Sequence, residues 1–152
     1  MRRALMTAQP AALALNTTMV VHGGCFEYGC AGTGFSGSGK DAILTEAPNA
    51  TLRHLGPNGE WEYEGSSAQE SEADVRARAR SVVSWLRDEA MPQARGGAVV
   101  LFAHQTFLDL LLQLLLTGSD ASWTYGMPKH KLAHTGVVRV LAHADGRVEQ
   151  QR

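Results

Sequence analysis

The sequence has little cysteine, almost no net charge and no long apolar run, and each of these features excludes a class of protein. Two cysteines, Cys25 and Cys30, are too few for a disulfide framework and favour free thiols in a reducing compartment. A net charge of −1 leaves no basic excess, so we expect neither a nucleic-acid nor an anionic membrane partner. The most apolar run, 107–116, is too short to cross a membrane and contains Asp109 and Gln113.

What is present is the composition of an ordinary globular domain. The 152 residues, 44% hydrophobic and 19% charged, suffice for one domain with a buried core, and no linker or internal repeat divides them. Residues 1–26 contain no acid and include Arg2 and Arg3, which is also typical of an organelle transit peptide. We expect instead that they open a folded cytoplasmic domain, and organelle import stays as the alternative.

Hydrophobic periodicity and turn residues predict alternating helices and strands. Helices are expected over 3–15 with an interruption at Pro10, from Asp41 as N-cap to before Pro48, over 71–94 and over 107–116. Strands are expected over 19–22, 98–103 and 137–142, the last turning at Asp145-Gly146 into 147–149, whereas 51–67 is irregular. The run AVVLFA at 98–103 is typical of a strand buried on both faces, so the pattern predicts an α/β fold with a mostly parallel sheet.

The stretch GTGFSGSGKDA, 32–42, contains two overlapping nucleotide-binding patterns. G-x-x-x-x-G-K ends at Lys40, and G-x-G-x-x-G overlaps it. A phosphate-binding loop requires a buried strand before the glycines and a Ser or Thr after the lysine. Here no strand is predicted directly before the glycines, and the residue after Lys40 is Asp41, whose carboxylate would repel phosphate. The stretch is therefore interpreted as a glycine-rich loop.

His104 is the clearest candidate site residue. It directly follows the predicted strand 98–103 and precedes the predicted helix 107–116. Ligands of open parallel sheets bind beyond the carboxyl ends of strands, beside helix N-termini whose free amides favour anions. By this argument alone, His104 suits a functional role as well as a structural one.

Other polar residues receive structural interpretations. The predicted helix 71–94 carries spaced arginines after a run of acids, which is typical of a solvated helix face. These arginines are Arg76, Arg78 and Arg80. His130 and His134 have the spacing of metal ligands on a helix, but no Glu accompanies them in an H-E-x-x-H pattern, so no metal site is predicted.

Several segments in order resemble one protein family. They are MRRALMTAQPAALAL, GCFEYG, ESEADVRARARSVVSWL, VVLFAHQTFLDLLLQLLLTG and KLAHTGVVRVL. Together they resemble the histidine phosphatase superfamily, also called phosphoglycerate mutase-like proteins, over nearly the whole chain. The resemblance implies a three-layer α/β/α sandwich with a mostly parallel sheet. It also implies hydrolysis or transfer of a phosphate monoester through a phosphohistidine, with a small phosphorylated substrate and no metal or other cofactor.

The resemblance assigns roles to particular residues. Arg3 matches the arginine that grips the phosphoryl group, for which a guanidinium fork is suited. Glu27 matches the general acid and base, which would protonate the leaving oxygen and then activate water. His104 matches the second pocket histidine, which would hold the phosphoryl oxygens and stabilise developing charge. The glycine-rich loop after Glu27 would then act as a lid beside the pocket.

The sequence departs from the family in one serious respect. The family opens with a central strand ending in Arg-His-Gly, whose histidine is the nucleophile, and no Arg-His-Gly occurs here. The nearest triplet, Arg53-His54-Leu55, has no predicted strand before it. Gln105 also replaces the usual glycine, and His134 replaces the usual asparagine.

From these departures we expect residues 1–152 to form a single domain incomplete at its N-terminus, without its first strand and of low stability. The short segment 32–48 favours a phosphatase-like relative over a mutase. The expected function is that of a phosphomonoester phosphatase that is inactive as given. The alternative is a non-catalytic module that binds phosphate esters or a protein partner, and the oligomeric state stays open.

Overall fold

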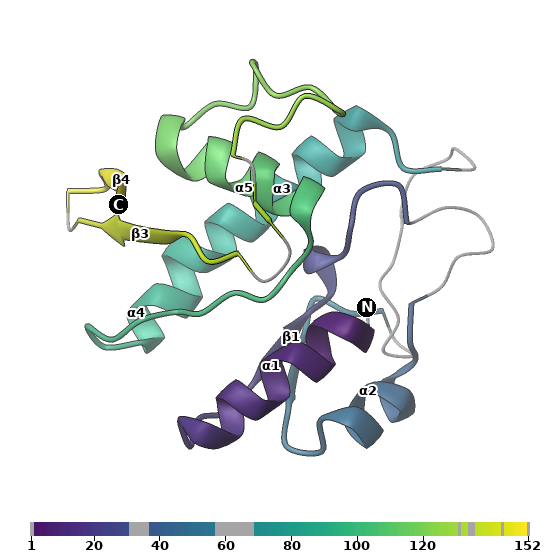
Figure 1. Ribbon diagram of the computed structural model, residues 1–152. Helices are drawn as coiled ribbons and strands as arrows, with labels where there is room; N and C mark the ends of the chain where they lie inside the picture. The colour runs from purple at the N-terminus through teal and green to yellow at the C-terminus, as the bar shows by residue number, and fades with distance from the viewer. Residues whose placement is uncertain are drawn as a thin grey trace.

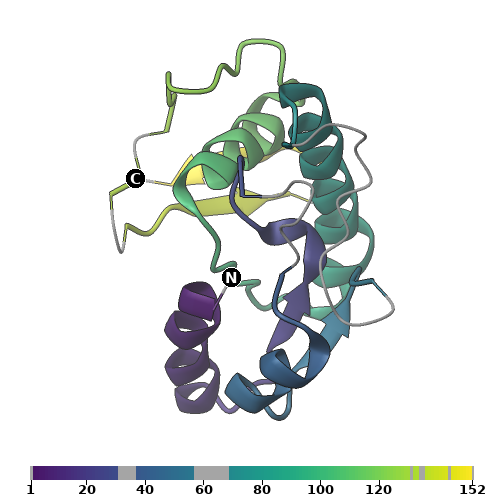
Figure 2. The same ribbon diagram turned by 90° about the vertical axis from the view of Figure 1, so that its right-hand side faces the viewer.

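The computed structural model describes residues 2–30, 37–56, 69–130, 132–133, 136–143 and 145–151. In chain order the elements are α1 (Arg2–Ala14), β1 (Val20–His22), a 3-10 turn (Gly23–Cys25), α2 (Lys40–Glu46), β2 (Thr51–Arg53), α3 (Glu72–Trp85), a π-helical turn (Leu86–Ala90), α4 (Met91–Gln93), α5 (Gln105–Thr117), β3 (Arg139–Ala142) and β4 (Val148–Gln151). This is a mixed α/β structure. Figure 1 shows α3 and α5 packed together in one half and α1 near α2 in the other, and Figure 2 shows both groups from the side.

The hydrophobic core forms where α3 packs on α5. Apolar residues recur on one face of each helix, so each presents a continuous apolar stripe to the other. The buried members are Val75, Ala79, Val82, Val83 and Leu86 from the first helix and its extension, Phe107, Leu110, Leu111 and Leu114 from α5, and Trp123 from the segment that follows. The core is thus assembled mainly by the second half of the chain.

Local signals explain where these two helices begin and end. At the start of α3, Ser71 Oγ accepts a hydrogen bond from the Asp74 amide, and Asp74 Oδ2 accepts one from the Ser71 amide, which is a capping box. Gly118 closes α5 in the left-handed region, with φ of 70°. The expected helix 71–94 is confirmed, although it contains the π-helical turn at Leu86–Ala90.

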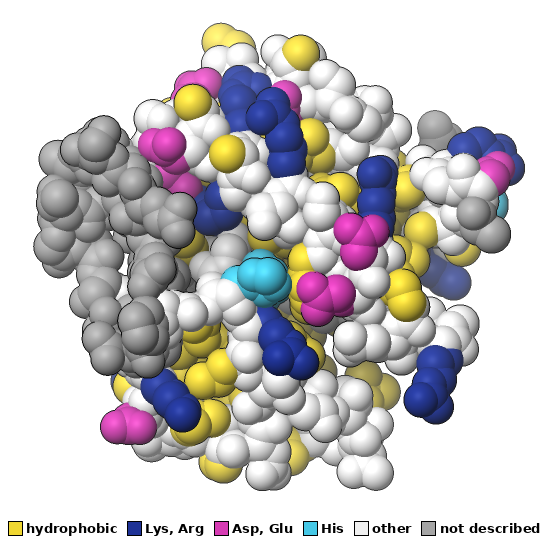
Figure 3. All heavy atoms as spheres, turned by 180° about the vertical axis from the view of Figure 1, so that it is seen from behind, with side chains coloured by type: hydrophobic (Ala, Val, Ile, Leu, Met, Phe, Trp, Pro, Cys, Tyr) yellow, Lys and Arg dark blue, Asp and Glu magenta, His cyan; other side chains and the backbone are white. Residues whose placement is uncertain are grey.

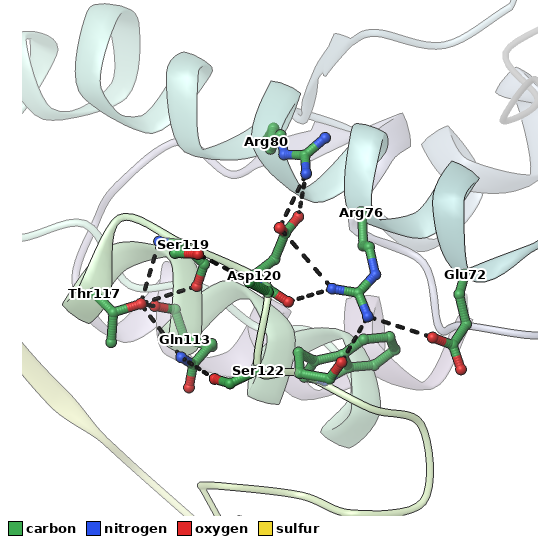
Figure 4. Close-up of polar contacts among 10 residues, drawn as sticks. Glu72, Arg76, Arg80, Gln113, Thr117, Ser119, Asp120 and Ser122 are labelled. Atoms are coloured by element: carbon green, nitrogen blue, oxygen red, sulfur yellow. Dashed lines mark hydrogen bonds and ion pairs between the residues drawn. The ribbon is translucent and has the colours of Figure 1, made fainter.

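A buried acid ties the segment after α5 to α3. Asp120 pairs with Arg80 at 2.7 Å, and the Asp120 carbonyl accepts a hydrogen bond from Arg76 (Figure 4). Arg76 also donates to the Trp123 carbonyl at 2.6 Å and lies over the Trp123 ring. These contacts hold the irregular segment 119–123 over the core. They also show that Arg76 is not part of a solvated face, contrary to the sequence expectation.

The described strands form two small sheets instead of one mostly parallel sheet. β1 and β2 are parallel, with Val20 opposite Thr51, and β3 and β4 form an antiparallel hairpin. The hairpin was expected, whereas β2 falls in a stretch expected to be irregular. Because β2 directly precedes His54, the expectation of no strand before Arg53-His54-Leu55 was wrong.

The prediction of a buried strand over 98–103 was also wrong. The segment is not a strand, and it has no ladder partner among the described residues. Val99 and Val100 are 39% and 63% exposed, whereas Leu101 and Ala103 pack against the core. Apolar composition favours burial, but a strand forms only where a neighbouring strand completes its backbone hydrogen bonds. In the described part of the chain that neighbour is missing.

Two helix details also differ from expectation. α1 is confirmed but continues through Pro10, even though proline removes one intrahelical donor. α2 is confirmed but begins at Lys40 with Gly39 as its N-cap, and Asp41 lies in the first turn. Throughout the described ranges, the helices are too short or too polar to cross a membrane.

Candidate active site

His104 stands at the entrance to α5. Its backbone is extended, with φ of −126° and ψ of 153°, and its carbonyl accepts the first helical hydrogen bond, 2.8 Å from the Leu108 amide. The His104 side chain does not cap the helix. The first amides of α5 are therefore available to another acceptor.

Glu27 supplies that acceptor from the loop after β1. Glu27 Oε2 accepts a hydrogen bond from the Thr106 amide at 3.3 Å, and Oε1 accepts one from the Phe107 amide at 3.0 Å. Oε1 also accepts a bond from the Tyr28 amide at 3.0 Å. The positive end of the helix dipole favours an acidic group at this position. Glu27 is thereby held in a defined orientation next to His104.

Arg3, on the first turn of α1, contacts His104 from the other end of the sequence. Both Nε and NH2 of Arg3 lie 3.3 Å from His104 Nδ1. Because a guanidinium only donates, Nδ1 must be the acceptor, which places the proton of the neutral imidazole on Nε2. His104 Nε2 is buried and has no hydrogen-bond partner among the described residues.

The pKa of His104 favours the neutral imidazole. His104 is 6% exposed, and burial lowers the pKa of its imidazole below the ordinary value. The Glu27 carboxylate opposes this effect by raising the His104 pKa, while the Arg3 guanidinium lowers it. At neutral pH the site therefore offers a neutral imidazole with an Nε2–H donor beside a guanidinium.

The structure thus places all three predicted site residues near the first turn of α5. Arg3 and His104 are in direct contact, and Glu27 accepts from the amides that follow His104. Glu27 is thus the anionic group that satisfies the first amides of α5, and the donors of the site that suit a further anion are those of Arg3 and His104.

Arg78 and Glu70 lie beneath this site, and no pattern in the sequence indicated a role for them there. Arg78 Nε and NH2 donate to the two Glu70 carboxylate oxygens, each at 2.7 Å. Their side chains are 13% and 1% exposed, so Arg78 is not on a solvated face as expected. Local charge patterning does not reveal this pair, because Glu70 lies before the start of α3 and is eight residues from Arg78 in the sequence.

The nucleotide-binding interpretation of Lys40 finds no support in the described residues. Lys40 is exposed and begins α2, Asp41 places a carboxylate in the same first turn, and the nearest described strand before Lys40, β1, ends at His22. Residues 32–36 of the expected lid, 32–42, lie outside the described ranges. His134, one of the two histidines considered as metal ligands, also lies outside the described ranges. No cluster of three potential metal-binding side chains occurs in the part of the chain that is described.

Two further histidines lie close together. His22 is the last residue of β1, and His54 directly follows β2. The rings of His22 and His54 stack with centroids 4.4 Å apart, and Trp85 lies 4.5 Å from His22. Burial, with a smaller effect of His54, lowers the pKa of His22 to about 4. Histidine side chains stand at the centre of the molecular face in Figure 3, with basic and acidic side chains nearby.

Comparison with known families identifies one superfamily for this sequence. The sequence matches the model of the histidine phosphatase superfamily (branch 1) over residues 1–151. Because this match spans nearly all 152 residues, the chain belongs to that superfamily, and the resemblance in its sequence is confirmed. Searches of curated proteins and of solved structures each returned no match.

Proposed function

We propose that this chain binds phosphate monoesters at the first turn of α5, with Arg3 and His104 as ligands of the phosphoryl group. One observation carries the proposal: the hydrogen bond from Arg3 to Nδ1 of the buried His104. It fixes the imidazole with its proton on Nε2, a buried atom that has no hydrogen-bond partner among the described residues. A guanidinium and an imidazole N–H side by side suit the oxygens of a phosphoryl group.

For the phosphatase activity that superfamily membership favours, Glu27 is the proposed proton donor and acceptor. Its Oε1 already accepts from two amides, which uses both lone pairs of that oxygen. Among the described residues its Oε2 accepts from one amide, which leaves one lone pair of that oxygen. A proton carried there could pass to a leaving oxygen without breaking the contacts that orient the carboxylate.

Turnover is a separate question. The superfamily reaction proceeds through a phosphohistidine, and these 152 residues contain no Arg-His-Gly to supply the nucleophile. Our proposal is therefore binding of phosphate esters without hydrolysis by this chain. Phosphomonoester phosphatase activity is the second candidate, and superfamily membership favours it. The family also implies a phosphoglycerate mutase-like fold.

Calorimetry and a turnover assay test the proposal together. Inorganic phosphate should bind to the chain, and Arg3→Ala should weaken binding about 10- to 100-fold through loss of charge-assisted hydrogen bonds. Arg2→Ala is the matched control, because Arg2 adjoins Arg3 but pairs with Glu46 at 2.6 Å. Turnover of p-nitrophenyl phosphate that disappears in His104→Ala would overturn the non-catalytic assignment and support the phosphatase.

A further inference from the structure

We propose that Arg78 is a positioning residue for Glu27, and that the Glu70–Arg78 pair fixes where the Glu27 carboxylate stands. The assignment of a proton-transfer role to Glu27 rests on the proposed function above. The positioning of Glu27 depends only on the contacts that Arg78 makes.

The first contact is to the backbone on the N-terminal side of Glu27. Arg78 NH1 donates to the Gly24 carbonyl at 2.9 Å and to the Phe26 carbonyl at 3.0 Å. The Phe26 carbonyl belongs to the peptide bond that joins Phe26 to Glu27. Because a peptide unit is planar, a hydrogen bond to that carbonyl sets the direction in which the Glu27 backbone leaves.

The second contact is to the helix that receives the Glu27 carboxylate. The Arg78 guanidinium carbon lies 3.6 Å from the centroid of the Phe26 ring and 4.6 Å from that of the Phe107 ring. Phe107 is fully buried, and its amide donates to Glu27 Oε1. One guanidinium therefore touches the residue before Glu27 and also the residue on α5 that holds the Glu27 carboxylate.

Glu70 keeps the guanidinium in this orientation. Its carboxylate binds Nε and NH2 in a parallel, two-bond arrangement, which leaves NH1 to reach the two carbonyls. Lysine cannot reproduce this geometry, because an ammonium has no planar fork with which to bind Glu70 and both carbonyls at fixed angles. Arg78→Lys retains a positive charge opposite Glu70 and is the informative variant, whereas Arg78→Ala leaves Glu70 buried without its partner.

The pKa of His104 reports the position of Glu27 without any ligand. The Glu27 carboxylate raises that pKa, and Arg3 and burial lower it. If Arg78→Lys lets Glu27 move away from α5, the pKa of His104 should fall. The side-chain NMR signals of His104, followed through a pH titration of the full chain, measure this directly.

The experiment compares the unmodified chain with four variants. Glu27→Gln removes the carboxylate charge and sets the reference fall in the His104 pKa. Arg78→Lys is expected to reproduce roughly half of that fall or more, and to cause no additional fall when combined with Glu27→Gln. The matched control is Arg80→Lys, on the same helix but paired with Asp120, which should leave the His104 pKa unchanged.

Two results would overturn the positioning role. One is an unchanged His104 pKa in an Arg78→Lys protein that has lost thermal stability, which would mark Arg78 as merely structural. The other is that Arg78→Lys lowers the His104 pKa by the same amount whether residue 27 is Glu or Gln. Absence of phosphate binding to the unmodified chain would refute the proposed function but would leave this test intact.

Discussion

The Glu27 carboxylate accepts a 3.0 Å hydrogen bond from the backbone amide of Phe107, eighty residues further along the chain. This contact joins the loop after β1 to the first turn of α5 and brings a carboxylate next to His104. It also links the candidate site to the hydrophobic core, because the Phe107 side chain is fully buried between α5 and α3. Substitutions in the core beneath α5 should therefore alter the position of the Glu27 carboxylate.

Arg78→Ala should be strongly destabilising. It leaves the Glu70 carboxylate buried without its charge partner and removes the donors for the Gly24 and Phe26 carbonyls. Breaking a buried pair in this way costs about 3–5 kcal/mol of the free energy of unfolding. Urea unfolding followed by circular dichroism measures the loss. Arg80→Ala should cost about 1 kcal/mol or less, since Arg80 is largely exposed; equal losses in the two variants would contradict this account.

The free energy of unfolding should decrease in mild acid because of His22. Its pKa is about 4 in the folded chain, against 6.5 for an ordinary histidine. Between these values the unfolded chain binds the additional proton, so stability is highest above pH 6.5 and is lost as the pH falls toward 4. Because His22 is only partly buried, solvent reduces the effect to about 1–2 kcal/mol. Urea midpoints at pH 7 and pH 5 measure it.

A variant separates His22 from the acids that titrate in the same range. His22→Gln should make the midpoint less dependent on pH between 7 and 5. The lowered pKa of His104 acts in the same direction and should account for part of what remains. If the urea midpoint of His22→Gln changes with pH as much as that of the unmodified chain, the stacked His22–His54 pair is not the origin of the loss of stability in acid.

Thermal unfolding of these 152 residues should be broad and occur at a low temperature. The extended segment 98–103 exposes Val99 and Val100 and has no strand partner in the described part of the chain, so part of its apolar surface stays in water. A circular dichroism melt tests this expectation. Val100→Lys should leave the melt nearly unchanged, because Val100 buries little surface. A sharp cooperative transition at high temperature would contradict the prediction.

Local patterns in the sequence predict the helices and the C-terminal hairpin well. Helical spacing of apolar residues locates α3 and α5, and the turn at Asp145-Gly146 locates the hairpin. The run 98–103 shows the limit of such patterns. Its composition is that of a buried strand, but composition does not encode whether another strand lies beside it.

His104 was indicated by its place before the predicted helix 107–116, whereas its grouping with Arg3 and Glu27 was predicted only through the family resemblance. Arg3, Glu27 and His104 are far apart in the sequence, and no periodicity relates them. The segments that resemble the family do relate them. Arg78 was misinterpreted because spaced arginines after acids are usually solvated. Only the fold shows that Arg78 turns inward to Glu70 while Arg80 stays largely exposed.

The most direct test of the account is whether inorganic phosphate contacts His104. The His104 imidazole signals of isotope-labelled chain are followed by NMR while phosphate is added at neutral pH. We predict a saturable shift of these signals that is retained in Arg2→Ala and lost in Arg3→Ala, because Arg3 holds the imidazole and supplies its guanidinium to the same anion. His104 signals that do not respond to phosphate, or that respond equally in Arg3→Ala, would contradict the proposed site.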